Sequence, residues 1–125
     1  MKLLVLSALL AFGHGAPSAS KRLDARQSSA GGTGKYPAIY KTESSLPAHT
    51  IYMPRTVPQD VKLPVMVWGN GGCAANGLSF RVFLTEIASH GYVIIASGAP
   101  NGQGSTTSKQ MRDSIDWIAA RAGAA

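Results

Sequence analysis

A glycine-rich loop that directly follows an apolar run is the part of this sequence best suited to chemistry. Residues 65–67 read Val-Met-Val, which is typical of a strand covered on both faces. The loop Gly69–Cys73 follows, and its glycines allow a sharp turn that leaves backbone N–H groups free to face a negative atom. Loops at the carboxyl ends of strands commonly carry chemistry in α/β proteins. The sequence therefore predicts an anion-stabilising backbone loop at the end of a central strand.

The histidines and the two neighbouring aspartates add no catalytic group to this loop. His14 lies in an N-terminal apolar segment, and His49 lies on an alternating strand, where we expect it to be half exposed. His90 lies at the end of a helix, where it can cap the last carbonyl groups. Asp113 and Asp116 share a polar helix face with basic residues, which is typical of a charged surface. We therefore expect no catalytic triad in these residues.

The first strands are predicted to form a hairpin. Strand-forming residues at 38–42 and 49–53 are separated by Ser-Ser-Leu-Pro, which favours an antiparallel pair. Pro54, Pro58 and the polar residues after them then predict a loop before the apolar run at 65–67. This hairpin leads into the central strand.

Beyond the glycine loop, the pattern predicts a helix, a second buried strand, a loop at 97–107 and a second helix. The first helix is expected to have its N-cap at Ser79 and to stop before Gly91, and the buried strand covers 92–96. The second helix is expected from about Ser108. The apolar faces predicted for the two helices are Phe80, Phe83, Leu84 and Ile87, and Met111, Ile115, Ile118 and Ala122.

The N-terminus is typical of a secretory signal peptide. Residues 1–16 carry a lysine, a ten-residue mostly apolar run and then small residues, and the run is too short to span a membrane. The segment 17–35 is rich in Ser, Gly and Ala and predicts a flexible lead-in or pro-segment. Its Lys21-Arg22 pair is either a dibasic processing site or a chance pair. We therefore expect a secreted, extracellular protein without a transmembrane segment.

Length and charge narrow the class further. A chain of 125 residues allows at most one modest domain. Without Lys2, Lys21 and Arg22, the 12 basic residues become 9 against 6 acidic ones, a net charge of +3. These basic residues are scattered and do not alternate with aromatic residues. The sequence therefore argues against nucleic acid as a partner.

The order of these motifs resembles a known family. The stretch PVMVWGNGG, then IASHGYVIIASG, then a Ser/Thr-rich loop and a helix is similar to secreted α/β-hydrolases. The likeness is greatest to the dienelactone-hydrolase, chlorophyllase and cutinase-like branches, and within them to fungal esterase-like proteins. It covers roughly residues 36–122. It implies that residues 36–125 are the N-terminal part of an α/β-hydrolase domain and that this domain is truncated.

The resemblance also implies roles for individual residues. In this family the loop after the third strand supplies a backbone N–H to the oxyanion hole, here from Gly71, Gly72 or Cys73. Trp68 and Asn70 would flank the substrate, or else serve as a core residue and a turn former. The implied substrate is a small-molecule or polymeric ester, with no cofactor and no metal. The oligomeric state stays open.

The departures from the family are informative. The nucleophile elbow Gly-x-Ser-x-Gly is absent from the 125 residues, and the nearest stretch, Gly102–Thr106, lacks the final glycine. We therefore expect no esterase activity from this chain alone. The single cysteine, Cys73, suggests either a free thiol or a disulfide partner in the missing part.

The glycine loop and its chain allow two other interpretations. Gly69–Ala74 also satisfies the dinucleotide-binding pattern, but the next helix begins too late to hold a pyrophosphate and the second strand does not end in an acidic residue. The other alternative is a small secreted, non-catalytic binding protein derived from a hydrolase. Its ligand would contact the loops 71–73 and 97–107.

Overall fold

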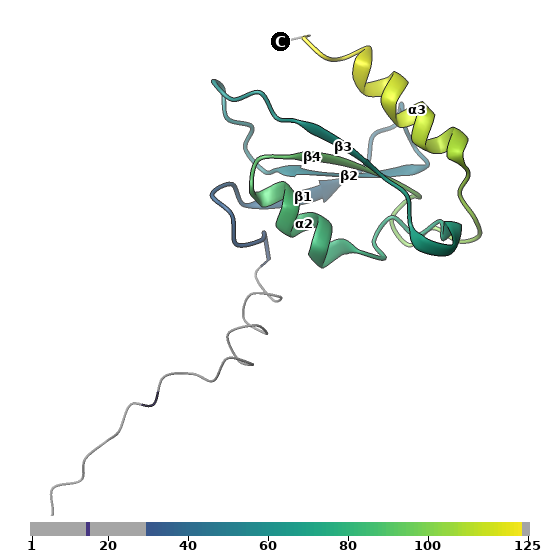
Figure 1. The fold of residues 1–125 in the computed structure, drawn as a ribbon, viewed down its shortest axis with the longest axis horizontal. Helices are drawn as coiled ribbons and strands as arrows, with labels where there is room; N and C mark the ends of the chain where they lie inside the picture. Colours follow the sequence, from purple (N-terminus) through teal and green to yellow (C-terminus); the bar gives the residue numbers. More distant parts are fainter. Residues whose placement is uncertain (1–14, 16–29, 124–125) are drawn as a thin grey trace, which may run out of the picture.

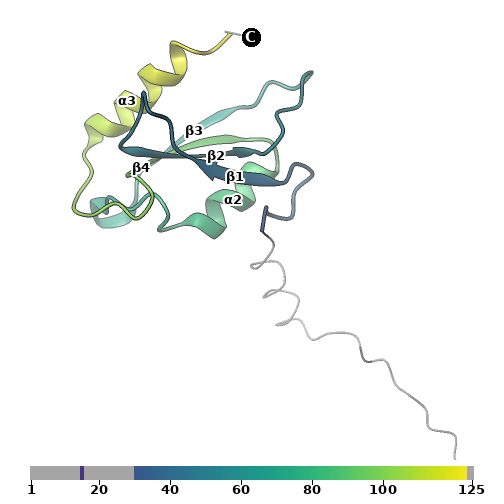
Figure 2. The same ribbon diagram turned by 180° about the vertical axis from the view of Figure 1, so that it is seen from behind.

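The computed structural model describes Gly15 and residues 30–123. These residues form a four-stranded mixed sheet with one helix on each face (Figures 1 and 2). The predicted α/β class is therefore confirmed. Outside the described residues lie the predictions made for the N-terminal end of the chain: the signal peptide at 1–16 apart from Gly15, the lead-in at 17–29, His14, and the Lys21-Arg22 pair.

The predicted hairpin is confirmed. Strands β1 (Ala38–Lys41) and β2 (His49–Pro54) pair antiparallel, with Ile39 opposite Met53. β2 is buried along almost its whole length, because it also pairs with a strand on its other side.

The central strand is β4 (Val93–Ser97), the predicted second buried strand. The sheet order is β1-β2-β4-β3, in which β4 runs antiparallel to β2 and parallel to β3 (Val65–Trp68). Residues 94–97 are fully buried. Both edges of β4 are paired and both faces are covered by helices, as its run of apolar residues requires.

The prediction that residues 65–67 form a strand covered on both faces is wrong in one respect. β3 forms where expected, but it lies at the edge of the sheet, and Val65 is 42% exposed. The apolar run alone could not distinguish the two positions, because both kinds of strand favour β-branched residues.

Helix α2 (Arg81–Ser89) covers one face of the sheet and packs over β1 and β2. Its Leu84 and Ala88 are fully buried against Tyr52 and Ile94 of the strands. These residues form the core on this face.

The predicted start and apolar face of α2 need correction. Ser79 is not the N-cap, since the helix begins at Arg81 with Phe80 in that position. Phe80 and Phe83 are exposed rather than buried. They lie beside the ring of Trp68, so the buried face is narrower than the apolar spacing indicated.

Helix α3 (Ser108–Ala119) covers the opposite face and packs over β3 and β4. It begins where predicted, and the side chain of Gln110 accepts a hydrogen bond from the backbone N–H of Thr107 at 2.9 Å.

The predicted apolar face of α3 is wrong for three of its four residues. Met111 and Ile115 are exposed, and Ala122 lies beyond the helix. The helix instead buries Ser114 and packs Trp117 and Ile118 against the core. The Ser114 hydroxyl donates to the carbonyl oxygen of Gln110 at 3.0 Å, which explains how a polar residue is buried here.

Part of the predicted flexible lead-in is held against α2. The Thr33 backbone N–H donates to a carboxylate oxygen of Glu86 at 2.8 Å, and the Thr33 hydroxyl bonds the other oxygen. The Gly34 N–H donates to the Ser89 hydroxyl at 2.9 Å, and the Tyr36 N–H donates to the Ser89 carbonyl at 2.9 Å. Residues 33–36 therefore belong to the folded unit.

We expect Gly34→Ala to destabilise the protein by about 1–3 kcal/mol, because the added methyl group would overlap the carbonyl group of Ser89. Urea unfolding followed by circular dichroism measures the change. The matched control is Gly71→Ala, where no atom lies within 4 Å of the added carbon. Equal stability of Gly34→Ala and Gly71→Ala would contradict the packing described for residues 33–36.

The same contacts predict a loss of stability in acid. The hydroxyl and backbone N–H of Thr33 hold the pKa of Glu86 below its ordinary value of 4.5, and His90 lowers it further. A carboxyl group whose folded pKa is depressed stabilises the fold above its unfolded pKa, and this contribution is lost as pH falls through the folded pKa.

We therefore expect the stability difference between the unchanged protein and Glu86→Gln to shrink as pH falls below about 4.5. Urea unfolding at a series of pH values measures this difference. Asp116→Asn is the control, because Asp116 is exposed and has no ion-pair partner among the described residues. A difference that is constant with pH would exclude the proposed role of Thr33.

Candidate functional site

Two loops meet at the carboxyl ends of the parallel strands β3 and β4. The Thr106 N–H donates to the Cys73 carbonyl at 2.7 Å, and the Ala75 N–H donates to the Gly104 carbonyl at 3.1 Å. Ala74 and Ser105 form an isolated antiparallel bridge between them. The loop after β3 and the loop after β4 are thus one hydrogen-bonded surface. Ligands of open α/β sheets bind at such an edge, where successive connections leave toward opposite faces.

The glycine loop forms a single 3-10 turn, η1 (Gly71–Cys73). The Cys73 N–H donates to the Asn70 carbonyl at 3.2 Å, and the Ala74 N–H donates to the Gly71 carbonyl at 3.4 Å. The N–H groups of Gly71 and Gly72 have no acceptor among the described residues. Of the three backbone donors predicted from the sequence, Cys73 is therefore engaged within the turn, and Gly71 and Gly72 are available.

The turn requires glycine at one position and is open to solvent. Gly72 has a φ of +64°, which residues with a side chain rarely adopt. Gly71, Gly72 and Cys73 are all exposed, and no atom lies within 4 Å of where a side chain on either glycine would begin. A ligand atom can therefore reach both free N–H groups.

Asn70 organises this turn from inside the protein. Its side chain is 8% exposed, and its amide nitrogen donates to the carbonyls of Ala74 at 2.8 Å and Asn76 at 2.9 Å. Its amide oxygen accepts the indole N–H of Trp68 at 3.0 Å. Both N–H groups and the oxygen are used. Of the two alternatives for Asn70, the geometry gives it the turn-forming role.

Trp68 lies between the core and the surface. Its ring packs edge-on against Phe80, with centroids 5.4 Å apart, and lies 5.7 Å from the ring of Phe83. Such pairs stabilise beyond their buried area. Through its indole N–H, Trp68 connects this aromatic cluster to Asn70 and hence to the glycine turn.

A buried tyrosine, Tyr52, is hydrogen-bonded to the loop that leads into α2. The Tyr52 hydroxyl donates to the Gly77 carbonyl at 2.6 Å, and burial raises the pKa of Tyr52 to about 12. The hydroxyl is therefore protonated at neutral pH and serves as a permanent donor. It fixes the loop that follows the glycine turn.

Neither described histidine is hydrogen-bonded to the glycine turn. His49, predicted to be half exposed, is only 2% exposed because α3 covers it, and its Nε2 lies 2.8 Å from the Gln110 carbonyl oxygen. It lies opposite Ser97 at the carboxyl end of β4, and its Nδ1 has no partner among the described residues. His90 is the C-cap of α2, as predicted, and its Nε2 lies 3.1 Å from a Glu86 carboxylate oxygen.

The structure also shows the surroundings of Asp113 and Cys73, which the sequence analysis considered. Asp113 forms an ion pair with Lys109 at 2.8 Å, which fits the predicted charged surface. Cys73 is a free, exposed thiol. Over residues 30–123, no three His, Cys, Asp or Glu side chains gather where they could hold a metal ion, and no helix there is long and apolar enough to cross a membrane.

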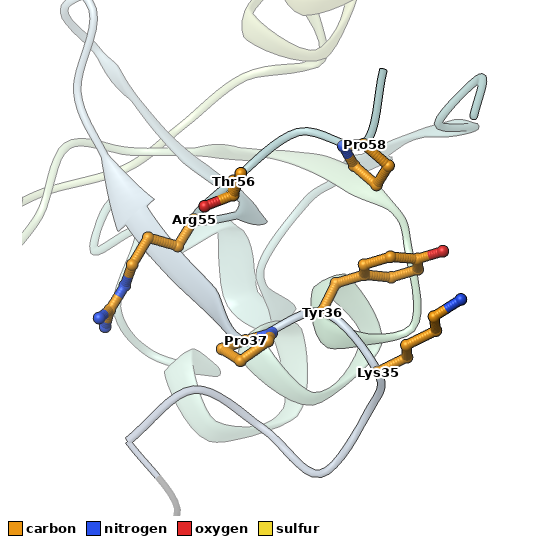
Figure 3. Close-up of a pocket in the computed structure, with 6 residues that line it drawn as sticks. All are labelled: Lys35, Tyr36, Pro37, Arg55, Thr56 and Pro58. Atoms are coloured by element: carbon orange, nitrogen blue, oxygen red, sulfur yellow. The ribbon is translucent and has the colours of Figure 1, made fainter. Parts of the chain in front are cut away.

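No sequence pattern indicates the pocket of about 440 Å³ that lies at the opposite end of the sheet (Figure 3). Lys35 and Arg55 supply its charge, but Figure 3 shows that their side chains point away from one another. The Tyr36 ring and two prolines form the rest of the lining together with Thr56. Because its polar groups do not converge, we do not regard it as the candidate site.

Comparison with known proteins adds no family assignment. The chain matches no protein-family model and no curated protein.

We expect Asn70→Ala to cost about 1–3 kcal/mol of stability, because the change leaves the partly buried indole N–H of Trp68 and the Ala74 carbonyl without partners and removes one of the two donors to the Asn76 carbonyl. Urea unfolding measures the loss. Gln103→Ala, in the neighbouring loop, is the control and should change stability by less than about 0.5 kcal/mol, because Gln103 is exposed. A small effect at Asn70 would mean that the turn does not depend on this side chain.

Proposed function

We propose that these residues form the oxyanion-binding part of a secreted carboxylic-ester hydrolase. The single observation that carries the proposal is the pair of free, exposed N–H groups of Gly71 and Gly72 in the turn after the third strand. In α/β-hydrolases the loop after the third strand supplies one backbone donor of the oxyanion hole. The mixed sheet, with its parallel β3 and β4, supports the same assignment.

The chemical role follows from the position of these donors. Acyl transfer passes through a tetrahedral intermediate with a negative oxygen, and a fixed N–H dipole stabilises that oxygen without reorganising. One donor of this kind lowers the barrier by about 2.7–4 kcal/mol. The hydrogen bonds of Asn70 and Tyr52 keep the turn and the loop after it in place, and Trp68 borders the site.

The rest of the mechanism needs groups that these residues do not supply. A serine nucleophile on Gly-x-Ser-x-Gly, an acidic residue and a histidine complete such a site in this family. The 125 residues contain no such serine motif, and neither described histidine is hydrogen-bonded to the glycine turn. In this proposal a further segment provides them, and the substrate is a small-molecule or polymeric ester.

A second candidate is a small secreted binding protein that keeps the turn without catalysis. The observation in its favour is that the described residues bury a core on each face of the sheet. Both candidates use the same turn to bind an oxygen anion. They differ in whether the chain folds cooperatively alone or needs a segment that carries Gly-x-Ser-x-Gly.

A titration with butylphosphonate, which presents tetrahedral anionic oxygens, tests the turn directly. We expect the amide signals of Gly71 and Gly72 to shift in a saturable way in the millimolar range (about 1–50 mM), and Cys73 to shift less because its N–H is already bonded. The 125 residues alone should hydrolyse no p-nitrophenyl butyrate above a heat-inactivated control.

Two matched glycine variants serve as controls for the titration. Gly72→Ala strains the turn at φ +64° and should weaken binding about tenfold, a loss of about 1.4 kcal/mol. Gly123→Ala, beyond the end of α3, imposes a similar strain at φ +87°, equally without a steric clash, and should leave binding unchanged. The absence of a Gly71 or Gly72 shift would refute the oxyanion role. A cooperative melt would favour the binding protein, and aggregation relieved by an added Gly-x-Ser-x-Gly segment would favour the hydrolase.

A further inference from the structure

Consecutive residues at the start of β2 hold both ends of the loop that follows β4. The Gly98 N–H donates to the Ala48 carbonyl oxygen at 2.8 Å, and the Thr50 hydroxyl donates to the Gly98 carbonyl oxygen at 2.9 Å. The Nε2 of His49, between them, lies 2.8 Å from the carbonyl oxygen of Gln110 in the first turn of α3. The start of the loop is therefore fixed to β2 directly, and its far end is fixed through His49.

The ring of His49 is used for one hydrogen bond. Its side chain is buried, and a buried polar group destabilises a fold unless it is hydrogen-bonded. A carbonyl oxygen can only accept, so Nε2 carries the proton and donates it to Gln110, whereas Nδ1 has no partner among the described residues. Within the described part of the chain, this is also the one side-chain hydrogen bond that joins a strand to α3.

Gln110 connects His49 to the loop residues that contact the glycine turn. The Gln110 side chain accepts the Thr107 N–H at 2.9 Å. The preceding residue, Thr106, is buried and donates both its N–H and its hydroxyl to the Cys73 carbonyl oxygen, at 2.7 and 3.2 Å. Cys73 ends the turn that carries the free N–H groups. A series of hydrogen bonds, with one peptide bond between Thr106 and Thr107, therefore joins His49 to the turn.

We propose that His49 is a positioning residue for the glycine turn. Its donor to Gln110 fixes the end of the 97–107 loop, so that Thr106 holds the turn from this loop while Asn70 holds it from inside the protein. Backbone donors stabilise a negative oxygen best when the groups behind them keep them in place. The effect of His49 on anion binding rests on the proposed function, whereas its effect on the contact between Thr106 and Cys73 does not.

Hydrogen exchange of the full 125-residue chain tests this contact. The matched variants are His49→Met, which removes the donor, and His49→Gln, which has the same length as Met and keeps an N–H donor. Relative to the Val93 amide, which donates to Pro64 in the sheet, the Thr106 amide should exchange about fivefold to tenfold faster in His49→Met. In His49→Gln this ratio should stay within about twofold of that in the unchanged protein. Equal ratios in all three proteins would overturn the proposal.

A second pair of variants tests the link through α3 without changing the core. Gln110→Ala removes the side chain that accepts the Thr107 N–H, and should raise the same exchange ratio at least about threefold. Lys109→Ala is the control in the same helical turn, because the Lys109 side chain is 78% exposed and pairs only with Asp113. A ratio in Gln110→Ala that is no higher than in Lys109→Ala would also count against the positioning role.

Titration with butylphosphonate tests the consequence for anion binding. The dissociation constant measured from the Gly71 and Gly72 amides should rise about fivefold in His49→Met and stay within about twofold in His49→Gln. Equal constants in the two variants would overturn the positioning role and leave the proposed function intact. If the unchanged protein gives no saturable shift, the proposed function fails, and the exchange ratios alone decide whether His49 positions the turn.

Discussion

The structure depends on the burial of β4 between two strands and two helices. Its successive side chains alternate between faces, so that Ile94 and Ala96 belong to the core under α2 and Ile95 belongs to the core under α3. One strand therefore holds both layers together. It also sets the site, because pairing with β3 places the two loops at the same end of the sheet. The glycine turn, which follows β3, therefore takes its position from the pairing of β3 with β4.

The order of elements could be predicted from the sequence because each has a local signal. The hairpin follows from alternation and a Ser-Ser-Leu-Pro break, and α3 begins at Ser108, directly after Thr107, which forms a capping pair with Gln110. The buried faces of the two helices were harder to predict from the sequence. Phe83 and Ile115 have helical spacing with buried residues but are exposed, since spacing tells which residues share a side and not how far the neighbouring layer extends.

The backbone of the site could be predicted from the sequence, but the hydrogen bonds between its side chains could not. Glycines after an apolar strand indicate a turn with free N–H groups, and that feature is local. Whether Asn70 faces a ligand or the protein depends on Trp68, Ala74 and Asn76, which surround it only after folding. His49 was misplaced for the same reason, because α3 covers it from 61 residues away in the chain.

The anchoring of residues 33–36 on α2 limits how far the chain can be shortened from its N-terminal side. Removal of the residues before Thr33 would leave the bonds from Thr33 to Glu86 and from Gly34 to Ser89 intact. Removal of the residues up to and including Gly34 would break both, and would place a charged amino group beside the end of α2. The folded unit therefore extends back at least to Thr33.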